Sequence, residues 1–243
     1  MTTLFSKKLW LVIGIFGGLL FFSIRDTRAA EPLFVFSWKA LNFAPSWYQG
    51  KILPVNQTKI VVSFEAISTN KSDYGKVLDL SNRNIIWYVN GEKLTQGRGL
   101  QQVVITKDNF PHDALEVNIR GEYFDTDLTS LQNTPSLYNK RFYIPITEPE
   151  AVLSYKKNDN YFTVGEVANF NLFPFFFNAS DNFLKVNWRV NNSWIQPSND
   201  NEFSLKLEIA DIPPSGYVTL VGAVYNLKNK LENSSKSITF NVR

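Results

Sequence analysis

Residues that could perform acid–base or nucleophilic chemistry are few in this sequence of 243 residues. It has no cysteine and a single histidine, His112, in the stretch NFPHDALEV. A cysteine nucleophile is therefore impossible, and a Ser-His-Asp triad would have to use His112. That histidine stands beside Pro111, where a loop is expected to enter a strand, and no partner constellation surrounds it in the sequence. We therefore predict no catalytic residue and no enzyme activity.

Metal ligands are equally sparse. Zinc would need clusters of His or Cys, which the sequence lacks. Calcium could use the oxygen-rich turns at Asp125 to Asp127, Asn178 to Asn182 and Asn199 to Glu202, but none has the spacing of an EF-hand loop. Asn, Asp and Ser dominate turns for conformational reasons alone. The sequence therefore predicts no metal site and no cofactor.

One pair of aromatic residues could contact a partner from the segment NFAPSWYQGKILP, residues 42–54. It carries Trp47 and Tyr48 between prolines and a glycine. If exposed, these rings could stack on sugars or grip a protein. Because large aromatic side chains most often serve packing, the alternative is that the segment folds over the end of its own domain and buries them.

A second candidate contact is the pair Trp194 and Ile195 in NNSWIQPSNDNE, residues 191–202. Trp194 has the same parity as Trp188, which favours inward packing if the preceding strand continues. A turn that begins at Asn191 would cancel that parity and leave Trp194 as an aromatic residue in a polar rim.

The first thirty residues have the pattern of an export signal. The basic start MTTLFSKK is followed by Leu9 to Ile24, a run of sixteen residues without a charge, and then by RDTRAA. This order is typical of a secretory signal peptide, and cleavage after Ala29 places the acceptable Thr27 at the minus-three position. The alternative is an uncleaved membrane anchor, although sixteen residues fall just short of the roughly 17 that a spanning helix needs. In both cases the rest of the chain is exported, and it meets the membrane only through residues 9–24 if they are retained.

Export changes the meaning of the charge. The whole chain has 25 basic and 22 acidic residues, and residues 1–30 hold four of the basic residues and one of the acidic ones. The remainder has 21 of each and no net charge, so nothing in its composition favours nucleic acid or an anionic membrane. An exported chain without cysteine is ordinary for a bacterial envelope protein.

Alternation of apolar and polar residues with period two runs through the chain after residue 30. The stretch KIVVSFEAI, residues 59–67, is one example, and RFYIPI and SITFNVR repeat the pattern. Such stretches predict half-buried strands. No sustained 3.6-residue period is present, so helix is limited to a turn or two, with KVLDLSNRN, residues 76–84, as the best candidate.

The predicted strands come in two similar sets. FVFSWKALN (34–42) matches AVLSYKKND (151–159), and NIIWYVNGEKL (84–94) matches KVNWRVNNSWI (185–195). About seven short strands per hundred residues are typical of an immunoglobulin-like β-sandwich. We predict an all-β chain with one sandwich at 31–147 and a second at 151–243, after an N-terminal signal peptide or anchor helix at 1–30.

Within this architecture, the residues of the repeated motif have structural roles in the core and in a turn. Trp87 and Trp188 are predicted to fill the space between the two sheets of each sandwich, as structural core. The pairs Asn90-Gly91 and Asn191-Asn192 suit a tight turn that leaves the Trp strand.

IIWYVNGEKL resembles the Trp-x-Val-Asn-Gly strand of bacterial Ig-like and PKD-like domains. The longer pattern, FSWKALNFAPSWYQGKILP followed by the Trp strand and TEPEAVLSYKKND, resembles tandem-domain envelope proteins of bacteria, including those of the candidate phyla radiation. The second copy departs from the motif, with Asn192 in place of Gly. The resemblance implies spacers, adhesive modules or parts of surface assemblies, and it supplies no catalytic residues.

Two functions follow as expectations. The first is a non-enzymatic, exported cell-envelope protein that gives spacing or protein–protein contacts in a surface assembly. The second is a carbohydrate- or cell-wall-binding module that uses exposed aromatic residues. The expected partners are therefore envelope or surface proteins, or a glycan.

Overall fold

The computed structural model describes residues 31–71, 73–106, 113–123, 136–157, 161–197, 201–209 and 216–243. Contacts divide the chain into two compact units, residues 1–33 with 66–78 and residues 34–65 with 79–243. The larger unit contains all the β-sheets apart from the ends of two strands.

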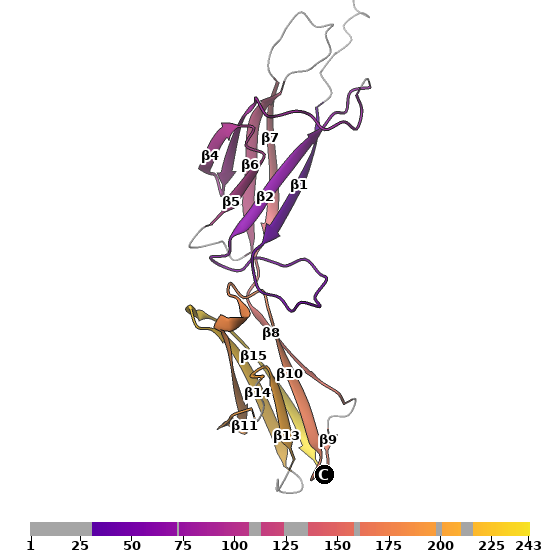
Figure 1. Cartoon of the computed structure of the whole chain (residues 1–243), viewed down its shortest axis with the longest axis vertical. Helices are drawn as coiled ribbons and strands as arrows, with labels where there is room; N and C mark the ends of the chain where they lie inside the picture. Colours follow the sequence, from indigo (N-terminus) through magenta and orange to yellow (C-terminus); the bar gives the residue numbers. More distant parts are fainter. Residues whose placement is uncertain are drawn as a thin grey trace, which may run out of the picture. The chain divides into compact units, whose positions relative to one another are not determined.

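The strands of the first half form two sheets (Figure 1). One sheet has the order β1 (Leu33–Ala40), β2 (Ile60–Ile67) and β5 (Gln102–Ile105). The other has the order β4 (Glu92–Arg98), β3 (Asn84–Val89), β6 (Ala114–Tyr123) and β7 (Ser136–Pro145). The strand predicted at 59–67 is confirmed as β2. Phe64 of β2 meets Trp87 of β3 with ring centroids 5.6 Å apart, so the inner faces of the two sheets share a core.

The strands of the second half repeat this arrangement. One sheet has the order β13 (Ser204–Glu208), β10 (Val167–Phe175) and β8 (Glu150–Tyr155). The other has the order β12 (Ser193–Ile195), β11 (Leu184–Val190), β14 (Tyr217–Asn226), β15 (Asn229–Val242) and β9 (Tyr161–Phe162). Their pairings are antiparallel except that of β15 with β9.

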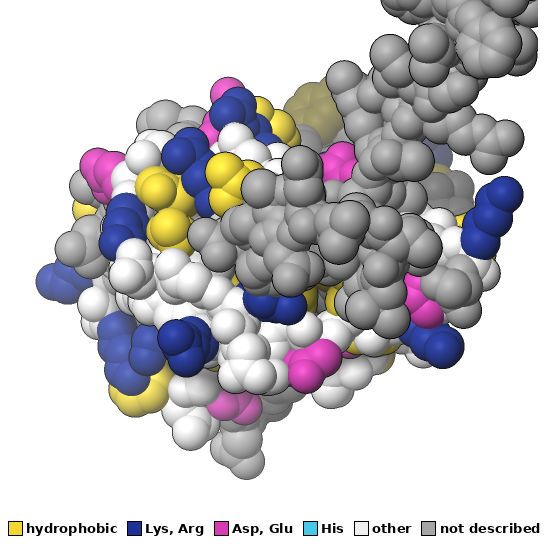
Figure 2. Space-filling view, turned by 90° about the horizontal axis from the view of Figure 1, so that it is seen from above, with side chains coloured by type: hydrophobic (Ala, Val, Ile, Leu, Met, Phe, Trp, Pro, Cys, Tyr) yellow, Lys and Arg dark blue, Asp and Glu magenta, His cyan; other side chains and the backbone are white. Residues whose placement is uncertain are grey.

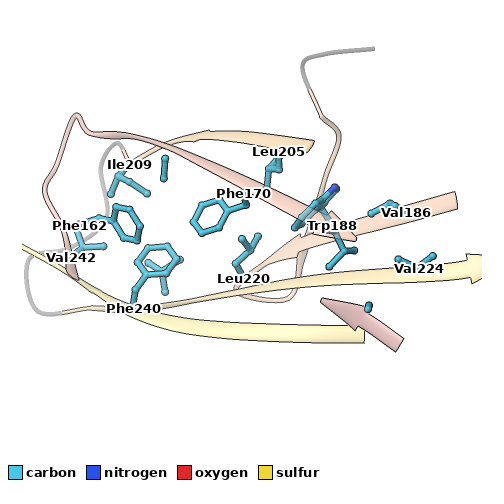
Figure 3. Packing of buried hydrophobic residues seen from close by; sticks show 14 of the residues in the cluster. Phe162, Phe170, Val186, Trp188, Leu205, Ile209, Leu220, Val224, Phe240 and Val242 are labelled. Carbon is cyan, nitrogen blue, oxygen red and sulfur yellow. The ribbon is translucent and has the colours of Figure 1, made fainter. Parts of the chain in front are cut away.

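Alternating residues from both sheets fill the second core (Figure 3). Phe170 of β10 stacks on Phe240 of β15 at 6.1 Å, and Phe162 meets Phe240 edge to face at 4.6 Å. The chain is therefore all-β, with two tandem immunoglobulin-like β-sandwiches, and the predicted fold class is confirmed.

The repeated Trp strand occupies matching positions in the two sandwiches. The exposed fraction of Trp87 is 0% and that of Trp188 is 1%. The Trp87 indole N–H donates to the carbonyl of Leu100 at 2.7 Å, and that of Trp188 to the carbonyl of Glu202 at 2.9 Å. Each indole thus buries its apolar body and still satisfies its one polar group.

The asparagine of the motif has two tasks. Asn90 and Asn191 have φ of +50° and +45°, and each is followed by a second positive-φ residue, Gly91 or Asn192. Two such residues in a row make the tight hairpin turn that suits the twist of the flanking strands. The Asn90 side chain also accepts from the amide of Glu116 at 3.0 Å, and that of Asn191 from the amide of Thr219 at 2.9 Å. Asparagine therefore tolerates the turn and ties it to the neighbouring strand.

The predicted helical turn at residues 76–84 was wrong. Val77 forms a β-bridge with Ile67, and the amide of Leu78 donates to the carbonyl of Ala66 at 2.8 Å. Pairing with the end of β2 therefore holds Val77 and Leu78 in an extended form, and a turn closed by the hydrogen bond from the amide of Arg83 to the carbonyl of Leu80 follows. Within the described ranges, the one helical turn is a 3₁₀ turn at Asp181–Phe183, labelled η1.

The predicted signal peptide or anchor at residues 1–30 lies outside the described residues. Among those that are described, no helix has the length and apolarity to cross a membrane. β7 ends at Pro145 and β8 begins at Glu150. The domain limits at 147 and 151 stay predictions. Figure 2 shows Lys and Arg side chains intermixed with Asp and Glu on the face seen from above.

Candidate functional site

The four candidate contact residues fall into two groups. Trp47 and Tyr48 lie in the connection between β1 and β2, with an exposed fraction of 58% for Trp47 and partial burial for Tyr48. Trp194 and Ile195 lie in β12, where Trp194 is 65% exposed and Ile195 partly buried. Whether they contact a partner stays a prediction.

Strand β10 presents aromatic residues on both of its faces. Phe170 and Leu172 are fully buried in the core between the sheets. Phe173 and Phe175 have the other parity and therefore point away from that core. Phe175 belongs instead to a smaller apolar cluster with Phe176 and Val55.

The connection between β1 and β2 covers this second face. Trp47 contacts Phe173 and Phe175 edge to face, with centroid distances of 5.3 Å and 5.8 Å. Tyr48 contacts Phe175 and Phe176 in the same manner, at 5.3 Å and 6.0 Å. Edge-to-face contacts are a favourable geometry for aromatic pairs and are worth about 0.5–1.5 kcal/mol each beyond area burial. We call residues 42–57 the connecting segment.

Backbone hydrogen bonds fix the connecting segment to the residues after β10. The amide of Phe43 donates to the carbonyl of Phe177, and the amide of Phe176 donates to the carbonyl of Phe43, both at 2.7 Å. The Asn42 side chain donates to the carbonyls of Leu53 and Phe176 at 3.0 Å and 2.8 Å. Phe176 has φ of +64°, which is unusual for a bulky residue and which this two-way pairing holds in place.

A polar contact lies at the other end of the segment. The Asn178 side chain donates to the carbonyl of Gln57 at 3.1 Å. Behind it, the amide of Asn178 and the side chain of Asn226 both donate to the carboxylate of Glu232, which is 6% exposed. Burial raises the pKa of Glu232, although these two hydrogen bonds oppose the shift.

The segment therefore does something that neither sequence-based alternative described. Its rings neither project freely nor cover only their own sandwich, because they pack on residues 173–177 of the second one. Sequence reasoning missed Phe173, Phe175 and Phe176. The signal was present in NLFPFFFN, where the apolar run breaks the period-two pattern and so requires cover on both faces.

Trp194 and Ile195 are separated by the turn before them. The two-residue turn at Asn191-Asn192 pairs Ile195 with Trp188 and Trp194 with Arg189. Ile195 thus shares the inward face of Trp188 and packs against the second core. Trp194 points outward, and the Arg189 guanidinium lies 5.0 Å from the centroid of its ring.

Groups for catalysis or metal binding are not brought together among the described residues. His112 and the turn at Asp125 to Asp127 lie outside them, as do Asn199 and Asp200. No group of three or more His, Asp or Glu side chains that could hold a metal ion occurs in the described part of the chain. In the turn at Asn178 to Asn182, the Asp181 carboxylate accepts from the amide of Asn182 at 2.9 Å.

No model of a protein family matches the chain, and no curated protein matches it. Among solved structures, the fibronectin(III)-like modules of Clostridium thermocellum CbhA are similar at 10% identity and a TM-score of 0.28, over 85% of this chain and 94% of that one. Three N-terminal domains of the outer capsid protein Hoc of bacteriophage RB49 are similar at 12% identity and a TM-score of 0.39, over 86% and 59%. Immunoglobulin domains 1–5 of Sidekick-1 are similar at 17% identity and a TM-score of 0.29, over 87% and 38%. Similarity this distant does not place the chain in any of these families.

Proposed function

We propose that this chain is a non-enzymatic, exported cell-envelope protein that gives spacing or protein–protein contacts in a surface assembly. The observation that carries the proposal is the connecting segment, which covers the outward aromatic residues of β10 and pairs with the backbone after it. A spacer keeps its partners at a fixed distance only if its domains do not move freely about a hinge. A large apolar contact between domains is what suppresses the motion that is otherwise expected of tandem domains.

The comparison of the two copies supports this reading. The second copy has no equivalent of the long connecting segment, because the chain passes from β8 to β10 within residues 156–166. The segment is therefore not required to build a sandwich. Its apolar residues instead stabilise the contact with residues 173–177.

The cellular location of the protein and its contacts with other envelope proteins can be tested together in the source cells. The full chain would carry a photo-crosslinking amino acid at Trp194, with a matched variant labelled at Tyr74, which is 78% exposed. We expect the protein in the envelope or the medium, with a mass that begins near Ala30, and crosslinks to another envelope protein from Trp194 only. Recovery from the cytoplasm, or crosslinks that are no more frequent at Trp194 than at Tyr74, would contradict the proposal.

Carbohydrate binding is the second candidate function. It is supported by the exposure of Trp47 and Trp194, at 58% and 65%, each ring being held by a neighbour rather than free to turn. A fixed, exposed indole offers a preorganised surface to the C–H face of a sugar. A glycan array with Trp47→Ala and Trp194→Ala variants tests it, because binding that survives in both variants uses neither ring.

A further inference from the structure

The sheet β12-β11-β14-β15-β9 has an outer face that the core does not use. Along β14 the buried residues Leu220, Gly222 and Val224 point inward, so Val221 and Ala223 between them point outward. The strand register places the outward residues of neighbouring strands side by side. One row consists of Trp194, Arg189, Val221 and Ser237.

In the middle of β14 and β15, along residues 219–223 and 235–239, the outward residues are short and uncharged. Val221 and Ala223 occupy successive outward positions on β14, and Ser237 and Ser235 are their partners on β15. On the next row towards the turn, the hydroxyls of Thr219 and Thr239 lie 3.0 Å apart. Hydroxyls and a backbone covered only by short side chains are thus available to a ligand.

Large aromatic residues stand at the borders of this surface. Trp194 borders it on the edge strand β12, and Tyr217, which is 71% exposed, begins β14. Tyr217 pairs with Asn241, which in turn pairs with Tyr161 of β9. Aromatic rims around hydroxyls and amides suit a polyhydroxylated ligand better than a protein hot spot, which would want a larger apolar centre.

The charge of this outer face has one sign. Among the outward residues on the described strands of this sheet, the charged side chains are Lys185 and Arg189, both basic. Lys185 is already paired with Glu202 at 2.7 Å. Arg189 instead lies over the ring of Trp194, and no ion pair joins it to a carboxylate of the residues that the structure describes. This positive charge therefore lies next to an exposed aromatic residue of the face, Trp194, which is 65% exposed.

We propose that this outer face binds an acidic glycan, one whose sugar units carry carboxylate groups. The proposal rests on the second candidate function, carbohydrate binding. Trp194 supplies the stacking surface, because the residue is 65% exposed although Arg189 lies over its ring. Arg189 supplies two N–H donors that match a carboxylate. The hydroxyls of the central strands bind the sugar hydroxyls.

The test compares an acidic and a neutral hexasaccharide, hexagalacturonate and cellohexaose, by calorimetric titration of the full chain at low and physiological salt. We expect the acidic probe to bind and the neutral one to bind at least about tenfold more weakly, since charge complementarity sets the preference. Trp194→Ala is expected to weaken binding by about tenfold or more, and Arg189→Gln to remove the preference for the acidic probe. Tyr74→Ala, which removes an aromatic ring that is 78% exposed and lies elsewhere in the sequence, should leave binding unchanged, and Trp47→Ala is measured beside it.

Melting temperatures of all variants show whether any loss reflects unfolding. The proposal is overturned if hexagalacturonate does not bind, or if folded Trp194→Ala binds it as well as the parent does. Binding of both probes that is lost only in Trp47→Ala would also overturn it, while leaving carbohydrate binding itself in place.

Discussion

The two sandwiches solve one packing problem with glycines in different places. In the first, Trp87 faces Ile119 of β6, and the glycine lies two residues further along at Gly121. In the second, Trp188 faces Gly222 of β14, and Val224 follows two residues later. A Cβ at Gly121 would meet the ring of Tyr138, whereas one at Gly222 would meet Trp188 and Leu172 at 2.9 Å. Each core thus has one glycine on an inner strand of its larger sheet. Gly121 leaves space for the ring of Tyr138, and Gly222 leaves space for the ring of Trp188.

Some features of the repeated Trp motif are the same in both copies, and others differ. The indole hydrogen bond and the asparagine turn are the same in both copies, because they satisfy backbone and side-chain groups that any such strand presents. The volume around the indole varies, because close packing can be reached by several combinations of large and small residues.

The largest expected effect comes from the two tryptophans themselves. Trp87→Ala and Trp188→Ala each remove a fully buried ring and leave an indole-sized cavity, which should lower the free energy of unfolding by about 3–5 kcal/mol. Urea unfolding followed by circular dichroism measures this. A melting temperature within a degree or two of the parent for either variant would show that the ring does not support its core.

The connecting segment is present in the first copy and has no equivalent in the second. Substitutions in it should give the next largest change in stability. The double variant Trp47→Ala/Tyr48→Ala removes four edge-to-face contacts and should cost about 3 kcal/mol in total. We expect the parent to unfold in a single calorimetric transition and the variant in two, because the two cores lose their coupling.

Tyr74→Ala, at a position that is 78% exposed, is the matched control and should keep the single transition. Two transitions in the parent, or one in the double variant, would show that the connecting segment does not couple the sandwiches.

Gly222 tests the packing difference directly. Gly222→Ala places a methyl group 2.9 Å from both Trp188 and Leu172, so the free energy of unfolding should fall by about 2 kcal/mol. Gly97→Ala is the control, since its added Cβ meets only Leu100 at ordinary contact distances of 3.6 Å and 3.7 Å. If both variants have the same stability, Trp188 can move aside and the glycine is not needed.

Much of this could be predicted from the sequence because it is local. The Trp-x-Val-Asn motif fixes a buried ring, a strand and a turn within a few residues, and period-two alternation locates the strands around it. The orientation of Trp194 could not be predicted, since it depends on whether Asn192 joins Asn191 at positive φ and so shifts the register. The surface on which the connecting segment packs could not be predicted either. Its partners lie more than a hundred residues away, and a single sequence does not show which of two apolar surfaces will meet.

Glu232 gives the second sandwich a pH dependence. Burial raises its pKa in the folded state, so its contribution to stability is fully present below the pKa of the unfolded chain and is lost as pH rises through the folded value. We expect the melting temperature of the parent to decline from mildly acidic towards neutral pH more steeply than that of Glu232→Gln, which cannot ionise. Glu208→Gln, at an exposed position, is the control for removing one carboxylate. Identical slopes for all three proteins would contradict a role for Glu232.

The smallest effect concerns a hydroxyl that only the first sandwich buries. The Tyr138 ring is 2% exposed, and its hydroxyl has no hydrogen-bond partner among the described residues. Burial also raises the pKa of Tyr138 to about 12, so the group is neutral at all ordinary pH values. In the second sandwich the register places Ser234 at the corresponding position, opposite Val224, and its hydroxyl accepts from the amide of Ala151 at 3.0 Å.

Tyr138→Phe removes an unsatisfied polar group while keeping the ring that Gly121 accommodates, so we expect the free energy of unfolding to stay the same or to rise by up to about 1 kcal/mol. A fall of that size in urea unfolding would instead mean that the hydroxyl has a partner in the folded protein, such as a buried water.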